Sequence, residues 1–352
     1  ALAGKSTLNR LERTRADATT ATRYAKIVYD AAAIESFFVE AFLAAHATPP
    51  AEIVLDLDAT DDPLHGNQEG RFFHGYYRAY CYLPLYIFCG DFLLAAKLRR
   101  ADGDGAAGAV AEVARIVAQI RARWPQVRIV VRGDSGFARE ELMQWCEAQA
   151  VDYVLGVARN ARLERAVADE LAQARAQHAA TGAAARVYKD FAYQTRKTWA
   201  RARRIVGKAE YLPGKANPRF VVTSLSAEQW APAALYEQLY CARGDMENRI
   251  KEQQLGLFAD RTSTATMRGN QLRLWVSSVA YVLVETVRRV GLAGTELARA
   301  QVGTIRTRLF KLAGLVRVSV RRVTLALSSV FPLQRLFAHA LANLQRAFPL
   351  RC

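Results

Sequence analysis

Two short apolar segments that each run into an aspartate constrain the fold most. Residues 53–58 (IVLDLD) and 127–134 (VRIVVRGD) are rich in branched aliphatic residues and are followed by turn residues, which is typical of buried strands. Aromatic and branched residues over 72–80 and 82–98 predict two more strands, and the pattern over 109–124 predicts a helix. Strands interleaved with helices predict an α/β fold.

The same periodicity and residue types predict helices and strands in the rest of the chain. Apolar residues at helical spacing predict helices over 21–46, 140–149, 162–178, from about 232 to beyond Arg289, and over 332–347. Period-two alternation and β-branched residues predict strands over 151–157, 187–195, 200–212 and 220–225, and a hairpin within 304–328.

Asp58 and Asp134 each end a predicted strand and open a turn. Carboxylates at the carboxyl ends of neighbouring strands lie where α/β sheets build their sites. Two divalent ions can be shared by such carboxylates, and ligands that are all oxygen favour Mg²⁺ or Mn²⁺ over zinc. Asp56 is an alternative to Asp58 because it lies two residues away on the same strand face. Strand-end aspartates are also ordinary turn formers, which is the competing interpretation.

A third carboxylate, Glu247, lies in a predicted helix beside groups that can bind phosphate. At helical spacing one face, spanning roughly 80°, contains Tyr240, Arg243, Glu247, Lys251 and Gln254. Gly244 inside this segment indicates either a close backbone approach or a helix that begins later. Together with the two aspartates, the pattern predicts metal-dependent chemistry on nucleic acid.

The net charge of +16 is distributed unevenly along the chain. Residues 186–219 contain ten Lys/Arg against two acids, and residues 261–352 contain fifteen against two. Basic segments rich in arginine attract DNA phosphates, so Arg201, Arg203 and Arg204 are candidate DNA contacts. A basic surface that is merely solvated is the alternative interpretation.

Other motifs carry weaker signals. Residues 103–108 fit G-x-G-x-x-G, but Arg99, Arg100, Ala101 and Asp102 separate the strand from the first glycine, which favours a surface turn over a dinucleotide site. In GDSG (133–136), Phe137 stands where a nucleophile elbow needs glycine. Five cysteines without C-x-x-C spacing argue against zinc and disulfides, and no apolar run reaches about 18 residues, so we expect a cytoplasmic protein.

Taken together, IVLDLDATDDP, VVRGDSGF, ENRIKEQQLGLFADRTST and the spacing Tyr240-x2-Arg243-x3-Glu247 resemble bacterial insertion-sequence transposases of the DDE type. The chain is most similar to the insertion sequence thirteen-eighty group, within the superfamily that carries a Y-R-E-K signature. The resemblance implies a ribonuclease-H-like mixed sheet, Asp58, Asp134 and Glu247 as catalytic Mg²⁺ ligands, and Tyr240 and Arg243 as DNA contacts. The signature lysine falls at Gln254, and Lys251 one turn earlier is its candidate substitute.

The resemblance also implies a domain plan and partners. We expect a helical segment (1–50), the first part of the catalytic core (51–160), a β-rich insertion (161–230), the second part of the core (231–290) and a basic, mostly helical C-terminal region (291–352). An N-terminal DNA-binding part is expected before Ala1. The expected partners are double-stranded DNA, as terminal inverted repeats and target, and a second copy in a homodimer on DNA at the nucleoid. The competing hypotheses are a transposase-derived DNA-binding protein without catalysis and a structure-specific nuclease with the same core.

Overall fold

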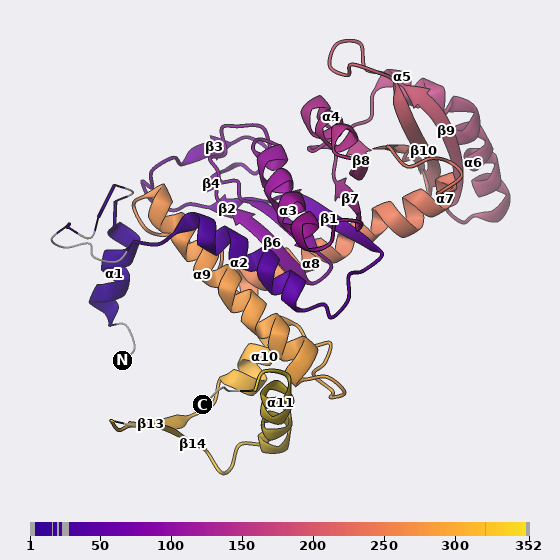
Figure 1. Ribbon diagram of the computed structural model, residues 1–352. Helices are drawn as coiled ribbons and strands as arrows, with labels where there is room; N and C mark the ends of the chain where they lie inside the picture. The colour runs from indigo at the N-terminus through magenta and orange to yellow at the C-terminus, as the bar shows by residue number, and fades with distance from the viewer. Residues whose placement is uncertain (1–3, 16, 20, 23–27, 321, 350–352) are drawn as a thin grey trace.

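A computed structural model describes residues 4–15, 17–19, 21–22, 28–320 and 322–349 (Figure 1). Its central strands are β1 Glu52–Ala59, β5 Leu85–Cys89, β6 Phe92–Lys97, β7 Arg128–Gly133, β8 Asp152–Val157, β9 Ala185–Tyr193, β10 Arg203–Leu212, β11 Lys215–Ala216 and β12 Arg219–Thr223. In the described part of the chain they form one nine-stranded sheet in the order β11-β10-β12-β8-β7-β1-β5-β6, with β9 paired to β10. The predicted mixed α/β fold is confirmed.

Strand direction changes within this sheet at β1. On one side β1 pairs parallel with β7, and β7 pairs parallel with β8. On the other side β1 pairs antiparallel with β5, and β5 with β6. The segment β6-β5-β1-β7-β8 is consistent with the expected ribonuclease-H-like core. Parallel pairing brings the carboxyl ends of β1 and β7 to the same edge of the sheet.

Three helices cover one face of the sheet: α2 Ala31–Ala44, α3 Ala109–Arg123 and α4 Glu140–Ala148. Side chains alternate across a strand, so Ile53, Leu55 and Leu57 of β1 point to this face and join a buried core with Phe42 and Ile116. The predicted helix over 21–46 is present from Ala31, and residues 23–27 of that prediction lie outside the described residues.

The opposite face is covered by a continuous helical segment and by α9 Met267–Thr286. The segment comprises α7 Pro232–Ala234, the π-helix η1 Leu235–Tyr240, the 3-10 turn η2 Cys241–Arg243, α8 Gly244–Lys251 and the π-helix η3 Glu252–Gly256. Met246 and Ile250 of α8 pack in the second apolar core with Trp275 and Tyr281 of α9. Because Asp56 and Asp58 alternate with the apolar residues of β1, they point towards this helical face.

The strands predicted over 187–225 form, but they do not make a separate sheet. β12 pairs antiparallel with β8, β10 pairs with β12, and β9 pairs with β10, so the core sheet continues through this region. Helices α5 Ala161–Ala166 and α6 Ala168–Thr181 pack beside it. Extending the sheet satisfies the backbone groups of β8 that would otherwise form an exposed edge.

A small three-stranded sheet interrupts the chain between β1 and β5. It contains β2 Asp62–Pro63, β3 Phe72–His74 and β4 Ala79–Tyr82 in the order β2-β4-β3. In Figure 1 it lies at one end of the central sheet, away from β9–β12. Where the sequence predicted one strand over 72–80, the chain therefore makes two short strands and a turn.

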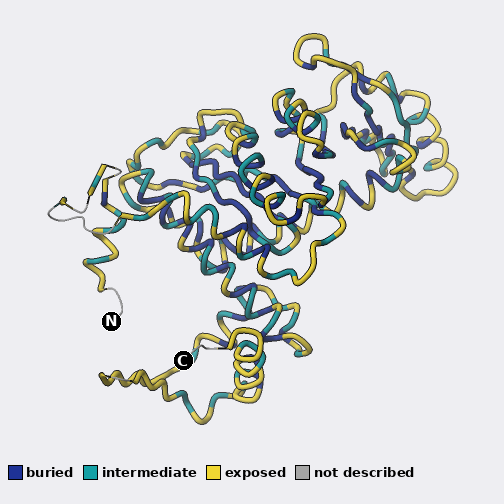
Figure 2. The backbone as a smooth tube through the Cα atoms, viewed as in Figure 1, coloured by how far each residue is buried: buried dark blue, intermediate teal, exposed yellow. Residues whose placement is uncertain are grey.

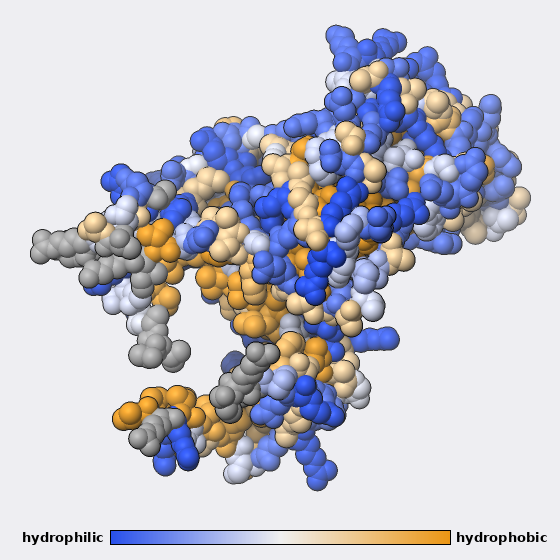
Figure 3. All heavy atoms as spheres, in the orientation of Figure 1, coloured by the Kyte–Doolittle hydropathy of each residue, from blue (hydrophilic) through white to orange (hydrophobic). Residues whose placement is uncertain are grey.

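The C-terminal region leaves the core through α9 and the π-helix η4 Val287–Gly291. It continues as α10 Val302–Ile305, η5 Arg306–Phe310, β13 Gly314–Val318, β14 Val323–Leu327 and α11 Gln334–Ala347, while α1 Lys5–Arg13 lies near the N-terminus. The predicted hairpin is thus confined to 314–327. Burial is concentrated in the central strands, and β13–β14 is exposed along nearly its whole length (Figure 2). Figure 3 shows apolar side chains gathered over this hairpin.

Candidate active site

Asp58 and Asp134 lie side by side at the carboxyl edge of the sheet. Leu57 of β1 is in register with Gly133 of β7, so the residues that follow each of them emerge together. The Ala59 backbone N–H donates to Asp58 Oδ1 (3.0 Å) and the Gly136 N–H donates to Asp134 Oδ1 (2.8 Å). These bonds orient both carboxylates at the ends of two rigid strands.

Helix α8 brings the third carboxylate to the same place. Glu247 and Arg243 line a cavity of about 350 Å³ together with Asp58 and Asp134. The cavity also includes Ala59, Thr60, Tyr76, Tyr77, Ile250, Lys251 and Gln254. The helix begins at Gly244, and a side chain added there would meet no atom within 4 Å. Gly244 is helical within the continuous segment and has no close neighbour, so neither sequence interpretation describes it.

Arg243 lies between the acids of this cavity. Its Nη2 donates to Glu247 Oε1 (2.7 Å), and its Nη1 lies 3.8 Å from Asp58 Oδ1. Within the described residues, this buried Nη1 has no hydrogen-bond partner. The guanidinium therefore balances the carboxylates without satisfying all of its own donors.

The carboxylates repel one another. Burial, followed by the negative charges of Asp134 and Glu247, raises the pKa of Asp58 to about 6, although Arg243 and the Ala59 N–H act in the opposite direction. A carboxyl with a raised pKa next to two other acids marks a site with excess negative charge. Such a site gains from binding a cation.

The donor set fits a divalent metal ion. Asp58, Asp134 and Glu247 offer only oxygen ligands, as Mg²⁺ or Mn²⁺ prefers. In the described part of the chain, no three His, Cys, Asp or Glu side chains are close enough together to hold an ion as they stand. Arg243 lies between Asp58 and Glu247.

Asp56, the alternative to Asp58 as a metal ligand, is not among the residues that line this cavity. Arg132 Nε donates to Asp56 Oδ1 (2.5 Å) and Nη2 donates to Oδ2 (2.7 Å), and both side chains are buried. Arg132 Nη1 also donates to the carbonyl of Leu239. The pair therefore ties β1 and β7 to the helical segment that carries Arg243 and Glu247.

Tyr240 does not line this cavity, although its hydroxyl lies close enough to Asp134 and Arg243 for their charges to act on it. A β-carbon added to Gly156 would lie 2.6 Å from the Tyr240 hydroxyl and 2.9 Å from the Ser135 backbone nitrogen, so Tyr240 packs over β8 beside the Asp134 turn. The π-helix η1 and the 3-10 turn η2 change the rotation per residue before α8. The even 3.6-residue period assumed from the sequence does not hold there.

Lys251 and Gln254 do share the cavity, as the spacing predicted. Gln254 Nε2 donates to the Asp61 carbonyl (3.1 Å). Lys251 is exposed and carries the positive charge at this part of the cavity. The structure thus brings Lys251 to the site and assigns Gln254 to holding the loop after β1.

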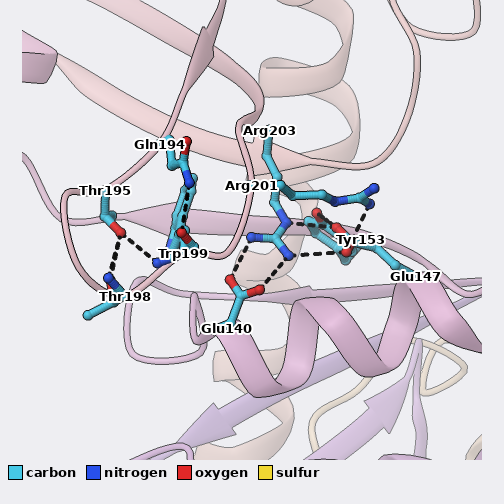
Figure 4. A network of polar contacts seen from close by, with 9 residues as sticks. All are labelled: Glu140, Glu147, Tyr153, Gln194, Thr195, Thr198, Trp199, Arg201 and Arg203. Carbon is cyan, nitrogen blue, oxygen red and sulfur yellow. Dashed lines mark hydrogen bonds and ion pairs between the residues drawn. The ribbon is translucent and has the colours of Figure 1, made fainter.

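Two of the three arginines expected to contact DNA are held in ion pairs within the protein. The Arg203 side chain is 3% exposed and donates to Glu140 (2.6 Å) and Glu147 (2.7 Å), as Figure 4 shows. Arg204 donates both to Asp190 (2.9 Å) and to the Leu225 carbonyl (2.7 Å). Arg201 is 62% exposed but lies 2.8 Å from Glu147. The number of these charges can be read from the sequence, but their ion-pair partners cannot.

The competing motifs form turns. Arg99 Nη1 donates to the carbonyls of Gly105 (2.8 Å) and Ala107 (2.7 Å), which occupies the backbone of the 103–108 loop. Residues 134–137 form the tight turn in which Asp134 caps the Gly136 nitrogen.

Sequence reasoning missed four residues around the site: Arg132, Gly156, Tyr76 and Tyr77. Gly156 had a usable signal, because glycine inside a strand often marks a close approach of another group. The two tyrosines had none, because the β3–β4 turn that carries them reaches the cavity only through tertiary folding.

Comparison with known proteins identifies the family of the chain. No curated protein sequence matches the chain. Along the described residues, no helix is both long and apolar enough to cross a bilayer. Residues 1–349 match the family described as transposase DDE domain group 1. That match, spanning nearly the whole sequence, agrees with acids carried on two strand ends and one helix, and the chain belongs to this family of DDE transposases.

Proposed function

We propose that this transposase cuts DNA strands at the ends of an insertion element and joins them to target DNA by metal-dependent phosphodiester hydrolysis and strand transfer. One observation carries the proposal: Asp58, Asp134 and Glu247 come from β1, the β7 turn and α8 and line a single cavity. The proposal places the element in the insertion sequence thirteen-eighty group on the motifs described above.

Asp58, Asp134 and Glu247 are the proposed ligands of two Mg²⁺ ions, for which Mn²⁺ can substitute. Bound there, the ions would activate the attacking oxygen and stabilise the leaving oxygen of the phosphodiester. The two aspartates stay fixed through their backbone hydrogen bonds. Glu247 is more exposed than Asp58 and is held by Arg243 alone among the hydrogen-bond partners described for it.

Arg243 and Lys251 are the proposed phosphate contacts. Arg243 lines the cavity and has a buried Nη1 without a hydrogen bond, and a guanidinium can bind two phosphate oxygens at once. Lys251 adds an exposed positive charge at the cavity wall. Tyr240, lying against Gly156, is proposed to limit where the DNA backbone can approach Asp134.

The proposed DNA surface of the β9–β12 region is the loop 194–202. Arg196, Lys197 and Arg201 are exposed there, and Thr195 holds the loop by accepting from the backbone nitrogens of Thr198 and Trp199. This loop replaces Arg203 and Arg204 as the predicted contact. The basic C-terminal region is proposed to bind DNA phosphates as well, with two copies of the chain assembled on two element ends.

The test is incubation of the purified protein with duplexes carrying the element's terminal repeats, with Mg²⁺ and in EDTA. Denaturing gels should show cleavage at the repeat ends and, with target DNA, joined products only when metal is present. Cleavage without joining on branched substrates of any sequence would favour a structure-specific nuclease. Tight binding without any cleavage would favour a DNA-binding protein that has lost catalysis.

A further inference from the structure

The small sheet β2-β4-β3 is fixed firmly to the body of the protein at its base. Thr262 Oγ1 donates to Asp62 Oδ2 (3.0 Å), and the Glu69 backbone nitrogen donates to the Ala265 carbonyl (2.8 Å). The buried Tyr82 hydroxyl donates to the Glu69 carbonyl (2.5 Å). The β3–β4 hairpin therefore projects from an anchored support and has a defined position.

The outer part of this hairpin carries aromatic side chains in solvent. Tyr76 is 84% exposed, and Phe72, Phe73 and Tyr80 are each close to half exposed. Phe73 and Tyr80 pair across the strands, with ring centroids 5.5 Å apart. Phe72 points to the opposite face of the hairpin, and we call Phe73, Tyr76 and Tyr80 the aromatic ridge. Soluble proteins seldom expose aromatic side chains together unless the surface binds something.

The ridge begins at the cavity that contains the carboxylates. Tyr76 and Tyr77, in the turn between β3 and β4, line the same cavity as Asp58 and Glu247, and their rings lie 5.0 Å apart. The Tyr77 hydroxyl lies 3.5 Å from the carbonyl of Ala59 at the end of β1. A chain whose phosphate lies in the cavity would therefore meet these rings with its adjoining groups.

We propose that the aromatic ridge stacks against unpaired nucleobases of the DNA strand that adjoins the phosphate held in the cavity. The inference rests on the proposed function and goes beyond it by assigning a second binding site with its own ligand. Aromatic rings beside a phosphate-binding site are the arrangement that binds single strands, because every base has a face that stacks. The Arg71 guanidinium, 4.6 Å from the Tyr80 ring centre, adds a planar cation to the same surface.

Paired bases do not fit this role. In a duplex the base faces are covered by their neighbours, and rings on a protein reach only groove edges and backbone. The ridge therefore selects strands that are already open at the cut or that open there on binding. An aliphatic protein partner fits less well, because the ridge carries tyrosine hydroxyls and a guanidinium beside a cavity lined by charged side chains of both signs.

The experiment measures binding without catalysis, in EDTA, so that it does not depend on the metal. The probes are a blunt duplex and the same duplex with a short unpaired overhang that contains 2-aminopurine, whose fluorescence falls on stacking. The wild type should quench the overhang and bind it more tightly than the blunt duplex. Tyr76→Ala should lose the quenching and weaken overhang binding by about tenfold, with blunt-duplex binding unchanged.

Three further variants control the test. Tyr76→Phe retains a ring and should quench as the wild type does, whereas Phe37→Ala removes a partly exposed aromatic residue of α2 and should change nothing. Phe73→Ala, further along the hairpin, should weaken overhang binding again. Because Tyr76 is almost fully exposed, its replacement should leave the melting temperature unchanged.

Equal wild-type affinity for both probes, or unchanged quenching in Tyr76→Ala, would overturn the stacking site while leaving the proposed cleavage intact. Loss of self-association in the ridge variants, with DNA binding unaffected, would also overturn it and would identify a protein interface. If the wild type quenches as expected but never cleaves terminal repeats in Mg²⁺, the proposed function fails and the stacking site stands.

Discussion

Two arginine–carboxylate clusters of this protein differ in how completely their charges are paired. Around Arg203, the carboxylates of Glu140 and Glu147 are bonded at 2.6–3.1 Å, and the guanidinium is buried among them. Around Arg243, one carboxylate is bonded at 2.7 Å and another lies 3.8 Å away, beside an open cavity. In the first cluster both carboxylates are hydrogen-bonded to the arginine, whereas in the second the carboxylates are only partly bonded and can bind a ligand.

The pKa values of one carboxyl in each cluster differ in the same way. Burial alone would raise the pKa of Glu147, but hydrogen bonds from Arg203, Arg201 and Tyr153 lower it to about 2. Burial and the neighbouring acids raise the pKa of Asp58 to about 6. A complete ion pair stabilises the fold, whereas a site with unbalanced acids costs stability and gains from a bound cation.

The largest effect should come from removing a carboxylate of the second cluster. Asp58→Ala should slow cleavage of terminal-repeat DNA by about 10⁴-fold, because a proposed ligand of both metal ions is lost. Binding of the same DNA in EDTA should remain, as measured by fluorescence anisotropy. Asp134→Ala and Glu247→Ala should behave alike, and retained cleavage in Asp58→Ala would remove the basis of the comparison.

Removing the arginine of the first cluster should act on stability. Arg203→Ala should lower the free energy of unfolding by about 4 kcal/mol, because Glu140 and Glu147 lose their buried partner. Urea denaturation measures this change, and Arg201→Ala is the matched control because its side chain is exposed. Similar losses in the two variants would show that the Arg203 pair contributes no more than a surface contact.

The two clusters should give stability opposite dependences on pH. Since the pKa of Asp58 is raised in the fold, its contribution is fully present below about pH 4 and is lost as pH rises through about 6, a change of about 3 kcal/mol. The Glu147 contribution is present above about pH 4 and is lost as pH falls through about 2. Denaturation of the wild type and Asp58→Asn in EDTA, between pH 4 and 7.5, should give curves that diverge as pH rises. Parallel curves would contradict the raised pKa.

Arg243→Ala should reduce cleavage by about a hundredfold, or about 2.7 kcal/mol, through loss of a phosphate contact. Unlike Arg203, Arg243 is proposed to act on the substrate, so the melting temperature should change little. Single-turnover cleavage with saturating DNA separates this effect from binding. A variant that cuts at the normal rate would place Arg243 with Arg203 among the structural arginines.

The smallest effect should come from the loop 194–202. Replacing Arg196, Lys197 and Arg201 together with alanine should weaken DNA binding by about tenfold for all sequences and lower the salt slope by about 3. Binding isotherms at several salt concentrations measure both quantities. Replacing Arg204, which is held by Asp190, should leave the salt slope unchanged, and a change there would restore it as a DNA contact.

The strand ends and the helical glutamate were readable from the sequence because local patterns specify them. Apolar runs that stop at Asp58 and Asp134 predict strand ends, and Glu247 lies at helical spacing from Arg243 and Lys251. These patterns depend on residues close together in the chain, so they can be recognised without the tertiary structure. The family match agrees with them over nearly the whole length.

What only the tertiary structure decided is which charged groups are free. Asp56 and Asp58 have the same side-chain direction, but Asp56 is in register with Arg132 and is bonded to it, whereas Asp58 lies at the open edge. Arg203 and Arg201 are two residues apart, yet one is buried and the other is exposed. The β3–β4 turn that brings Tyr76 to the cavity is also a tertiary effect. Partners far apart in sequence set the burial and pairing of each charge, and a local pattern contains no information about them.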